Sequence, residues 1–172
     1  MVNVRILTQR FLLRTLVVED VSEQYREWLK DEVAQRYIIA AGSPHDLNAL
    51  RAYVEERSAR DDVLFLGIFT LETNQHIGNI KYEPVDSTRG FAVMGILIGE
   101  PAWRGQLVAE EVITATASWL RDERGIREIV LGVHKKNTAA IKAYERAGFV
   151  VATTTRITVD SQSISTLVLQ LR

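Results

Sequence analysis

The sequence predicts a mixed α/β fold in which helices pack on a sheet. Short apolar segments, typical of strands, alternate with segments in which apolar residues recur at helical spacing. Residues 63–82 contain two strand-like segments joined by a polar turn, as in a hairpin. Residues 108–124 carry the longest helical pattern of the chain. Together these patterns indicate a layer of strands covered by helices.

The N-terminal part is expected to form one strand and then two helices. Residues 11–16 are mostly apolar and form the first predicted strand. Residues 19–22 offer helix-start chemistry, and the apolar positions within residues 25–29 share one helical face. A second helix is expected after the Ser-Pro step at residues 43–44.

The middle of the chain is expected to form three strands and the long helix. The strands are predicted at residues 63–69, 76–82 and 91–99. The helix over residues 108–124 has acidic residues near its start and basic residues near its end, the order that the helix dipole favours. Gly125 is suited to end it. The remaining elements are a strand at 128–133, a helix at 138–147, a strand beginning within 149–155, and a strand at 163–171.

Length and composition predict one domain spanning residues 1–172. The net charge of −1 gives no reason to expect nucleic acid or a membrane as a partner. The absence of cysteine excludes disulfides, thiolate zinc sites and a thiol nucleophile. The three histidines lack metal-like spacing, so no metal is expected. No apolar run has the length of a membrane span or a signal peptide, and we expect a cytoplasmic protein.

The turn before the long helix is a candidate anion site. It follows an apolar strand and contains Gly105, and Arg104 adds a positive charge. Backbone N–H groups at a helix start lack intrahelical partners and can bind a pyrophosphate. Taken alone, a glycine before a helix is more often ordinary loop chemistry.

A second candidate segment is the helix that begins after a strand near residue 137. Asn137 is a good N-cap, and Tyr144 lies seven residues later, on the same side of the helix. A buried tyrosine can donate a proton to a leaving thiolate. The alternative is that Asn137 only caps the helix and Tyr144 only packs.

These segments resemble the GNAT superfamily of N-acetyltransferases. Residues 103–111 match its cofactor turn. Residues 137–149 match its more specific ending, in which an Asn, a helix of small residues, a Tyr and a Gly-Phe pair follow one another. The order of elements is also similar over nearly the whole chain. The chain looks most similar to the RimJ/RimL-like branch, and residues 25–33, 76–81 and 95–99 resemble members that acetylate amino groups of sugars.

The resemblance implies a mostly antiparallel central sheet with helices on both faces, and acetyl-coenzyme A as co-substrate. An amine of a small molecule would attack the thioester directly, Asn137 would contact the cofactor arm, and Tyr144 would protonate the coenzyme A thiolate. The pantetheine arm would bind as an added strand to the backbone of Ile96, Leu97 and Ile98. The pyrophosphate would bind the N–H groups of Arg104, Gly105, Gln106, Leu107, Val108 and Ala109.

The turn departs from the family pattern at two positions. Leu107 stands where the family usually has a second glycine, and Ala102 stands where it usually has Gln or Arg. A glycine lets the backbone approach the phosphates and adopt unusual torsion angles, whereas the Leu107 side chain must point away. We expect the loop to tolerate both changes, because residues 137–144 are intact.

The general base and the acceptor are less defined by the sequence. Glu83 is the first candidate base, ahead of Asp86, Glu100 and His76. The acceptor is expected between the N-terminal helices and the strands near residues 81–89. Candidate walls of its pocket are Trp28, Tyr37 and Tyr82. Candidate contacts to an acidic or nucleotide-bearing acceptor are Arg36, Arg51 and Arg57, although solvated helix faces explain these arginines more simply.

Three functions remain open from the sequence. The first is acetylation of a small-molecule amine, such as an amino sugar or nucleotide sugar. The second is acetylation of a protein N-terminus, which needs an open groove rather than a closed polar pocket. The third is a domain that binds a ligand or partner without catalysis, because of Leu107. A homodimer, with residues 163–171 at its interface, is expected by analogy alone.

Overall fold

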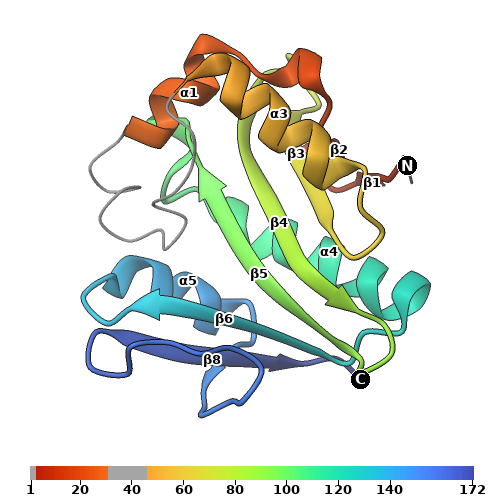
Figure 1. The fold of residues 1–172 in the computed structure, drawn as a ribbon. Coiled ribbons are helices and arrows are strands. Elements are labelled where there is room, and N and C mark those ends of the chain that lie inside the picture. Colours follow the sequence, from red (N-terminus) through yellow and green to blue (C-terminus); the bar gives the residue numbers. More distant parts are fainter. Residues whose placement is uncertain (1–2, 31–45) are drawn as a thin grey trace.

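The computed structural model describes residues 3–30 and 46–172. Its strands form one eight-stranded sheet in the order β1-β2-β3-β4-β5-β6-β8-β7 (Figure 1). The strands are β1 (Arg5–Leu7), β2 (Phe11–Thr15), β3 (Leu64–Thr70), β4 (His76–Asp86), β5 (Phe91–Ile98), β6 (Glu128–His134), β7 (Val150–Val151) and β8 (Ile164–Gln170). The helices are α1 (Glu23–Lys30), α3 (Leu47–Ser58), α4 (Val108–Arg124) and α5 (Thr138–Arg146), with short 3₁₀ turns η1 (Val18–Asp20) and η2 (Pro101–Trp103).

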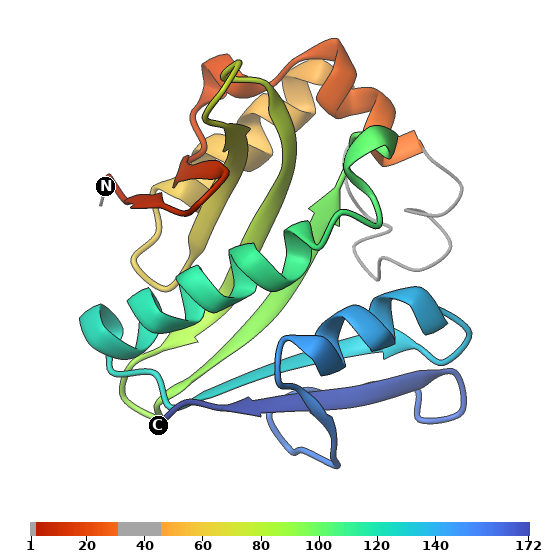
Figure 2. The same ribbon diagram turned by 180° about the vertical axis from the view of Figure 1, so that it is seen from behind.

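Neighbouring strands pair antiparallel except at β5 and β6, which pair in parallel. Helices α1 and α3 cover one face of the sheet, and α4 and α5 cover the other (Figures 1 and 2). The expected fold, a mostly antiparallel sheet with helices on both faces, is therefore confirmed. β3 is buried along its whole length because helices pack on both of its faces.

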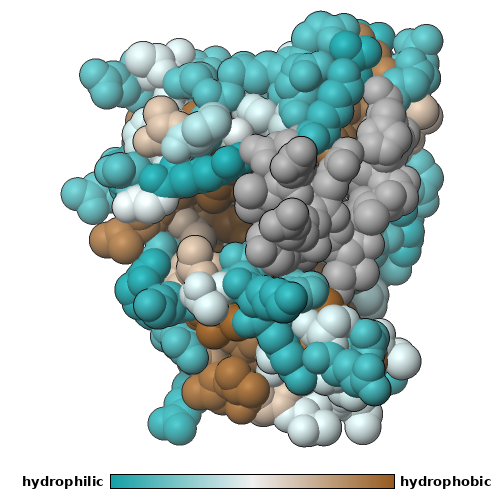
Figure 3. Space-filling view, turned by 90° about the vertical axis from the view of Figure 1, so that its left-hand side faces the viewer, coloured by the Kyte–Doolittle hydropathy of each residue, from teal (hydrophilic) through white to brown (hydrophobic). Residues whose placement is uncertain are grey.

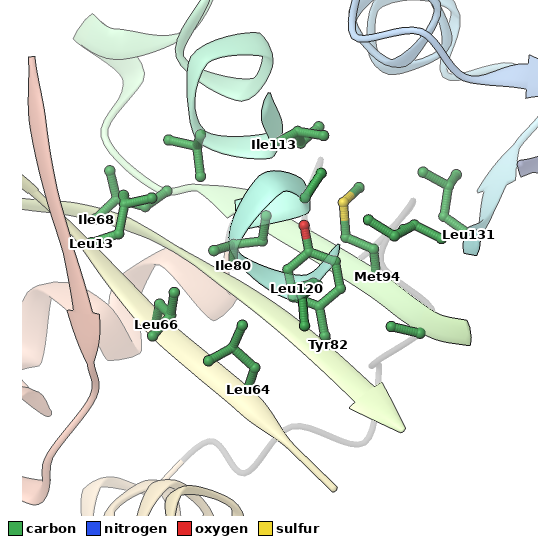
Figure 4. Close-up of a cluster of buried hydrophobic side chains, with 14 of the residues drawn as sticks. Leu13, Leu64, Leu66, Ile68, Ile80, Tyr82, Met94, Ile113, Leu120 and Leu131 are labelled. Atoms are coloured by element: carbon green, nitrogen blue, oxygen red, sulfur yellow. The ribbon is translucent and has the colours of Figure 1, made fainter. Parts of the chain in front are cut away.

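The larger core cluster lies between the sheet and α4 (Figure 4). β4 contributes Ile80 and Tyr82 to it, whereas Lys81 between them faces α3, as the alternation of a strand requires. The Tyr82 hydroxyl is hydrogen-bonded to the Thr116 hydroxyl of α4 at 2.7 Å, so its burial leaves no polar atom unsatisfied. Burying each large apolar side chain contributes about 1.5–3 kcal/mol to folding.

Helix α4 begins and ends where the sequence predicts. Gly125 terminates it in the left-handed conformation, at φ 66°, and donates its N–H to the Leu120 carbonyl. The structure also contains β1, which the sequence analysis did not predict. A three-residue strand shows too little alternation to be recognised, and it exists because β2 offers it a partner edge.

None of the helices in residues 3–30 and 46–172 is long and apolar enough to cross a membrane. Within those same ranges, no group of His, Asp and Glu is arranged to hold a metal ion.

Candidate active site

An opening in the sheet between β5 and β6 is the central feature of the site. The two strands pair only from Phe91–Glu128 to Val93–Val130. Beyond that point β5 continues along β4 while β6 continues along β8, so the strands separate (Figure 1). Figure 3 views the molecule from the side toward which they separate, and it shows a hollow with hydrophobic atoms inside it.

Among the described residues, the separation leaves one edge of β5 without a strand partner beyond Val93. Gly99 donates its N–H to Ile77 of β4, and backbone groups alternate in direction along a strand. The N–H and C=O groups of Ile96 and Ile98 therefore face the opening, whereas those of Leu97 pair with β4. The Ile98 carbonyl already accepts a hydrogen bond from Arg104 Nε at 3.1 Å. An extended ligand can pair with this edge as an added strand would.

The turn from β5 into α4 has the conformation of a glycine-rich loop. Gly105 and Leu107 both have positive φ, at 71° and 58°. The Leu107 side chain is 57% exposed and points to solvent, as its position requires. The first helical bond runs from the Glu111 N–H to the Leu107 carbonyl, so the N–H groups of Val108 and Ala109 precede it and lack intrahelical partners. The Arg104 N–H, by contrast, donates to Pro101.

Charge at this turn favours an anion. The dipole of α4 places partial positive charge at its start. The two carboxylates of the first turn are neutralised by ion pairs, Glu110 with Arg146 at 2.5 Å and Glu111 with Arg10 at 2.7 Å. An open groove of about 630 Å³ runs along this part of α4 and is lined by both carboxylates and by Gln106 and Leu107. An arriving phosphate would therefore not meet an unpaired carboxylate here.

Helix α5 carries Asn137 at its start and Tyr144 two turns later. The Asn137 carbonyl oxygen accepts a hydrogen bond from the Ala140 N–H at 3.2 Å, so this residue caps the helix. Tyr144 packs against the core, with its ring 5.9 Å from that of Phe149. Burial raises the pKa of its hydroxyl to about 12, and among the described residues that hydroxyl has no hydrogen-bond partner. It is a protonated donor at neutral pH.

Glu83 lies at a bulge of β4 and contacts three cations. Its carboxylate oxygens are 2.8 Å from Lys81 Nζ, 2.9 Å from Arg60 and 3.2 Å from Arg57. Partial burial raises the pKa of Glu83, but the hydrogen bond and charge of Lys81 and the two guanidinium groups outweigh it and hold that pKa below its usual range. Glu83 is thus ionised at neutral pH and weakly basic.

The other candidate bases have partners of their own. Asp86 is paired with Arg89 in an exposed turn, which lowers its pKa. Glu100 accepts hydrogen bonds from Trp28 Nε1 at 3.0 Å and from a glutamine of α1. His76 stacks on an aromatic ring of β3, and burial lowers its pKa although its hydrogen bond to an asparagine side chain opposes the shift.

The structure places the residues expected around the acceptor differently from one another. Tyr82 is not a pocket wall, because it faces α4 from the opposite side of the sheet and is completely buried. Trp28 is buried against Gly99 at the end of β5. Arg51 is on an exposed face of α3, where it contacts Asn48. Tyr37 and Arg36 lie outside the described residues.

The sequence analysis did not assign a site role to Lys81 and Gly95, on the sheet face that α3 covers, or to Tyr53 of that helix. Lys81 donates a hydrogen bond to the Tyr53 hydroxyl at 2.7 Å, and it pairs across strands with Gly95. A side chain added at Gly95 would meet no atom of residues 3–30 or 46–172 within 4 Å. A lysine inside an apolar strand was the available signal.

The sequence matches one family model, described as an acetyltransferase (GNAT) domain, over residues 10–150. Similar proteins include the N-acetyltransferase 9-like protein of Caenorhabditis briggsae, 23% identical over 84% of this chain and 76% of that protein. A shorter match is mycothiol acetyltransferase of Salinispora tropica, 37% identical over 33% of this chain and 18% of that protein.

Several solved structures with the same fold are described as acetyltransferases. One from Bacillus anthracis, of the GNAT family, has a TM-score of 0.79 at 16% identity, covering 97% of this chain and 98% of its own. The spermidine N-acetyltransferase of Vibrio cholerae, in complex with coenzyme A and spermine, has a TM-score of 0.77 at 16% identity, covering 93% and 95%. Aminoglycoside acetyltransferase AAC(6')-Ib, in complex with coenzyme A and kanamycin, has a TM-score of 0.72 at 18% identity, covering 92% and 93%. The chain belongs to the GNAT family of acetyltransferases, acyl-transferring enzymes whose co-substrate is acetyl-coenzyme A.

Proposed function

We propose that this protein acetylates a primary amine of a small molecule. The observation that carries the proposal is the unpaired β5 edge, which begins where β6 departs and leads to the start of α4. Structural neighbours named for spermidine and aminoglycosides support a small-molecule amine. An amino sugar or nucleotide sugar as acceptor, membership of the RimJ/RimL-like branch and a homodimer stay predictions.

Acetyl-coenzyme A fits the residues present. We propose that Ile96 and Ile98 hydrogen-bond its pantetheine arm, which requires Arg104 to release the Ile98 carbonyl. The N–H groups of residues 105–109 would hold the pyrophosphate at the positive end of α4. The Asn137 amide nitrogen would contact the arm, because only the oxygen of that side chain is used in capping.

The proposed reaction is a direct transfer. The neutral amine attacks the thioester carbonyl carbon, which forms the C–N bond and breaks the C–S bond. A backbone N–H of the open edge, such as that of Ile96, would stabilise the negative charge that develops on the carbonyl oxygen. Tyr144, which stays protonated at neutral pH, would give its proton to the departing thiolate.

The amine must lose a proton during the reaction. Glu83 stays our prediction for the group that receives it, directly or through a water molecule. Its three cations keep it ionised, which is the form a base requires, but they also weaken it as a base.

Two measurements test the function. Calorimetric titration with acetyl-coenzyme A should show binding at or below millimolar concentration, and a thiol-release assay with amines, amino sugars and N-terminal peptides should show turnover with the small molecules. Tyr144→Phe should lower kcat about 100-fold or more while leaving acetyl-coenzyme A affinity unchanged. Turnover of peptides alone would favour N-terminal acetylation, and binding without turnover would favour a non-catalytic domain.

A further inference from the structure

We propose that the acceptor amine carries an acidic group, which Lys81 binds above Gly95. This inference rests on the proposed function, because it identifies the acceptor class of the same site. It would exclude polycationic amines as preferred acceptors.

Lys81 and Gly95 lie side by side on one face of the sheet. Gly95 and Lys81 are direct partners across β5 and β4, and such partners project from the same face of a sheet. That face carries α3, since Lys81 contacts Tyr53 of this helix and lies 5.9 Å from the ring centre of Phe65. Gly95 is exposed, and the described part of the chain leaves open space where its side chain would be.

Gly95 and Lys81 lie close to the opening between β5 and β6. Gly95 is next to Ile96, whose backbone faces the opening where the thioester is proposed to lie. Adjacent strands are about 4.8 Å apart. A small acceptor above Gly95 can therefore place its amine at the opening and a second group beside Lys81.

Cations surround the single carboxylate of Glu83 on this face of the sheet. One ammonium N–H of Lys81 donates to Tyr53 and another faces Glu83, and the third has no partner in the part of the chain that the structure describes. Glu83 is shared among three cations. The other acids of the cluster, Glu56 and Asp62, are about half exposed and pair with arginines on the side of α3.

The free N–H of Lys81 among the described residues favours an anionic group of the acceptor. A carboxylate or phosphate can complete the coordination of Lys81 without displacing Tyr53 or Glu83. A polyamine or aminoglycoside would bring its positive charges next to Lys81, where the carboxylate of Glu83 is already shared among three cations. The geometry thus selects an anionic amine.

The test compares acceptors that differ only in the acidic group. Binding of glucosamine 6-phosphate and of glucosamine, and of O-phosphoethanolamine and ethanolamine, is measured by calorimetry on protein saturated with coenzyme A. Turnover of the same four compounds and of spermidine is measured with acetyl-coenzyme A. We expect at least one phosphorylated amine to bind about 10- to 100-fold more tightly than its neutral partner, the range for a hydrogen bond between charged groups.

Substitutions assign the effect to Lys81. Lys81→Met should remove the preference for the phosphorylated amine in binding to the coenzyme A complex, which is the readout here because turnover would also change through the lost Lys81–Glu83 ion pair. Lys81→Arg should restore part of the preference. Lys135→Met is the matched control, because the Lys135 ammonium is bonded to the Ser161 carbonyl instead. Gly95→Val should weaken all acceptors but leave acetyl-coenzyme A binding unchanged.

The outcomes separate the two proposals. Equal binding of the neutral and phosphorylated members of both pairs overturns the acidic-group inference, as does preferred turnover of spermidine. Turnover without a charge preference would leave the acetyltransferase proposal standing. Charge-selective binding that depends on Lys81, but without turnover, would support the inference and count against the proposed function.

Discussion

Leu107 holds a backbone conformation that leucine rarely adopts, at φ 58° and ψ 27°. A left-handed conformation costs a non-glycine residue about 1–2 kcal/mol, and the exposed side chain of Leu107 recovers little of that by packing. The conformation persists because the turn must connect β5 to the start of α4. Leu107 therefore occupies the glycine position of the family pattern while keeping the glycine conformation.

Leu107→Gly should raise the free energy of unfolding by about 0.5–1 kcal/mol, since the relief of strain exceeds the extra chain entropy that glycine loses. Urea denaturation measures this change. Gln106→Gly is the control, because Gln106 does not have a positive φ, and it should be neutral or destabilising. A less stable Leu107→Gly variant would show that the side chain contributes packing that its exposure does not reveal.

Glu83 also illustrates how a residue's surroundings limit its role. Its pKa lies below the usual range of a glutamate, so it is ionised at neutral pH and becomes protonated only as the pH falls through that lowered pKa. If it is the base, the rate should fall along an acidic limb located below the ordinary range of a glutamate. Glu83→Gln should lower turnover and remove that limb, with no change in acetyl-coenzyme A affinity.

Asp86→Asn is the matched control for Glu83→Gln, because Asp86 is an ion-paired carboxylate of the same strand end with a lowered pKa. A pH–rate curve that is identical in wild type and Glu83→Gln would reject Glu83 as the base. The loss of its three ion pairs is a separate effect, which a melting curve detects.

At the scale of elements, the sequence was most informative where a single segment determines its own structure. α4 was predicted from end to end, because its apolar period, its charge order and Gly125 all lie within the segment. β1 was missed because its three residues become a strand only beside β2. The contacts of the Lys81–Glu83 cluster were missed because its partners come from α3 and from the segment just after it, more than 20 residues away in sequence.

Asn137 caps helix α5, and its proposed contact with the cofactor arm is separable from that capping role. Asn137→Asp keeps the capping oxygen but loses the amide N–H₂, whereas Asn137→Ala loses both. We expect Asn137→Ala to lower the free energy of unfolding by about 1 kcal/mol and Asn137→Asp to leave it nearly unchanged. Both variants should weaken acetyl-coenzyme A binding, measured by calorimetry. Normal binding by Asn137→Asp would limit this residue to capping.

At the scale of the whole molecule, the separation of β5 from β6 creates the site. The sequence predicted both strands but not their pairing, because pairing depends on contacts between segments more than 30 residues apart. It also could not show that the backbones of Ile96 and Ile98 face the opening while that of Leu97 faces β4. That difference follows from the register of β4 and β5.

The register supplies a direct test of the opening. Ile96→Pro removes an N–H that faces the opening, and Leu97→Pro removes one that faces β4. We expect Ile96→Pro to weaken acetyl-coenzyme A binding about tenfold, the effect of losing one hydrogen bond, while the protein stays folded. Leu97→Pro should instead destabilise the sheet and lower the melting temperature further than Ile96→Pro does. Unchanged acetyl-coenzyme A binding by folded Ile96→Pro would mean that the cofactor arm does not pair with this edge of β5.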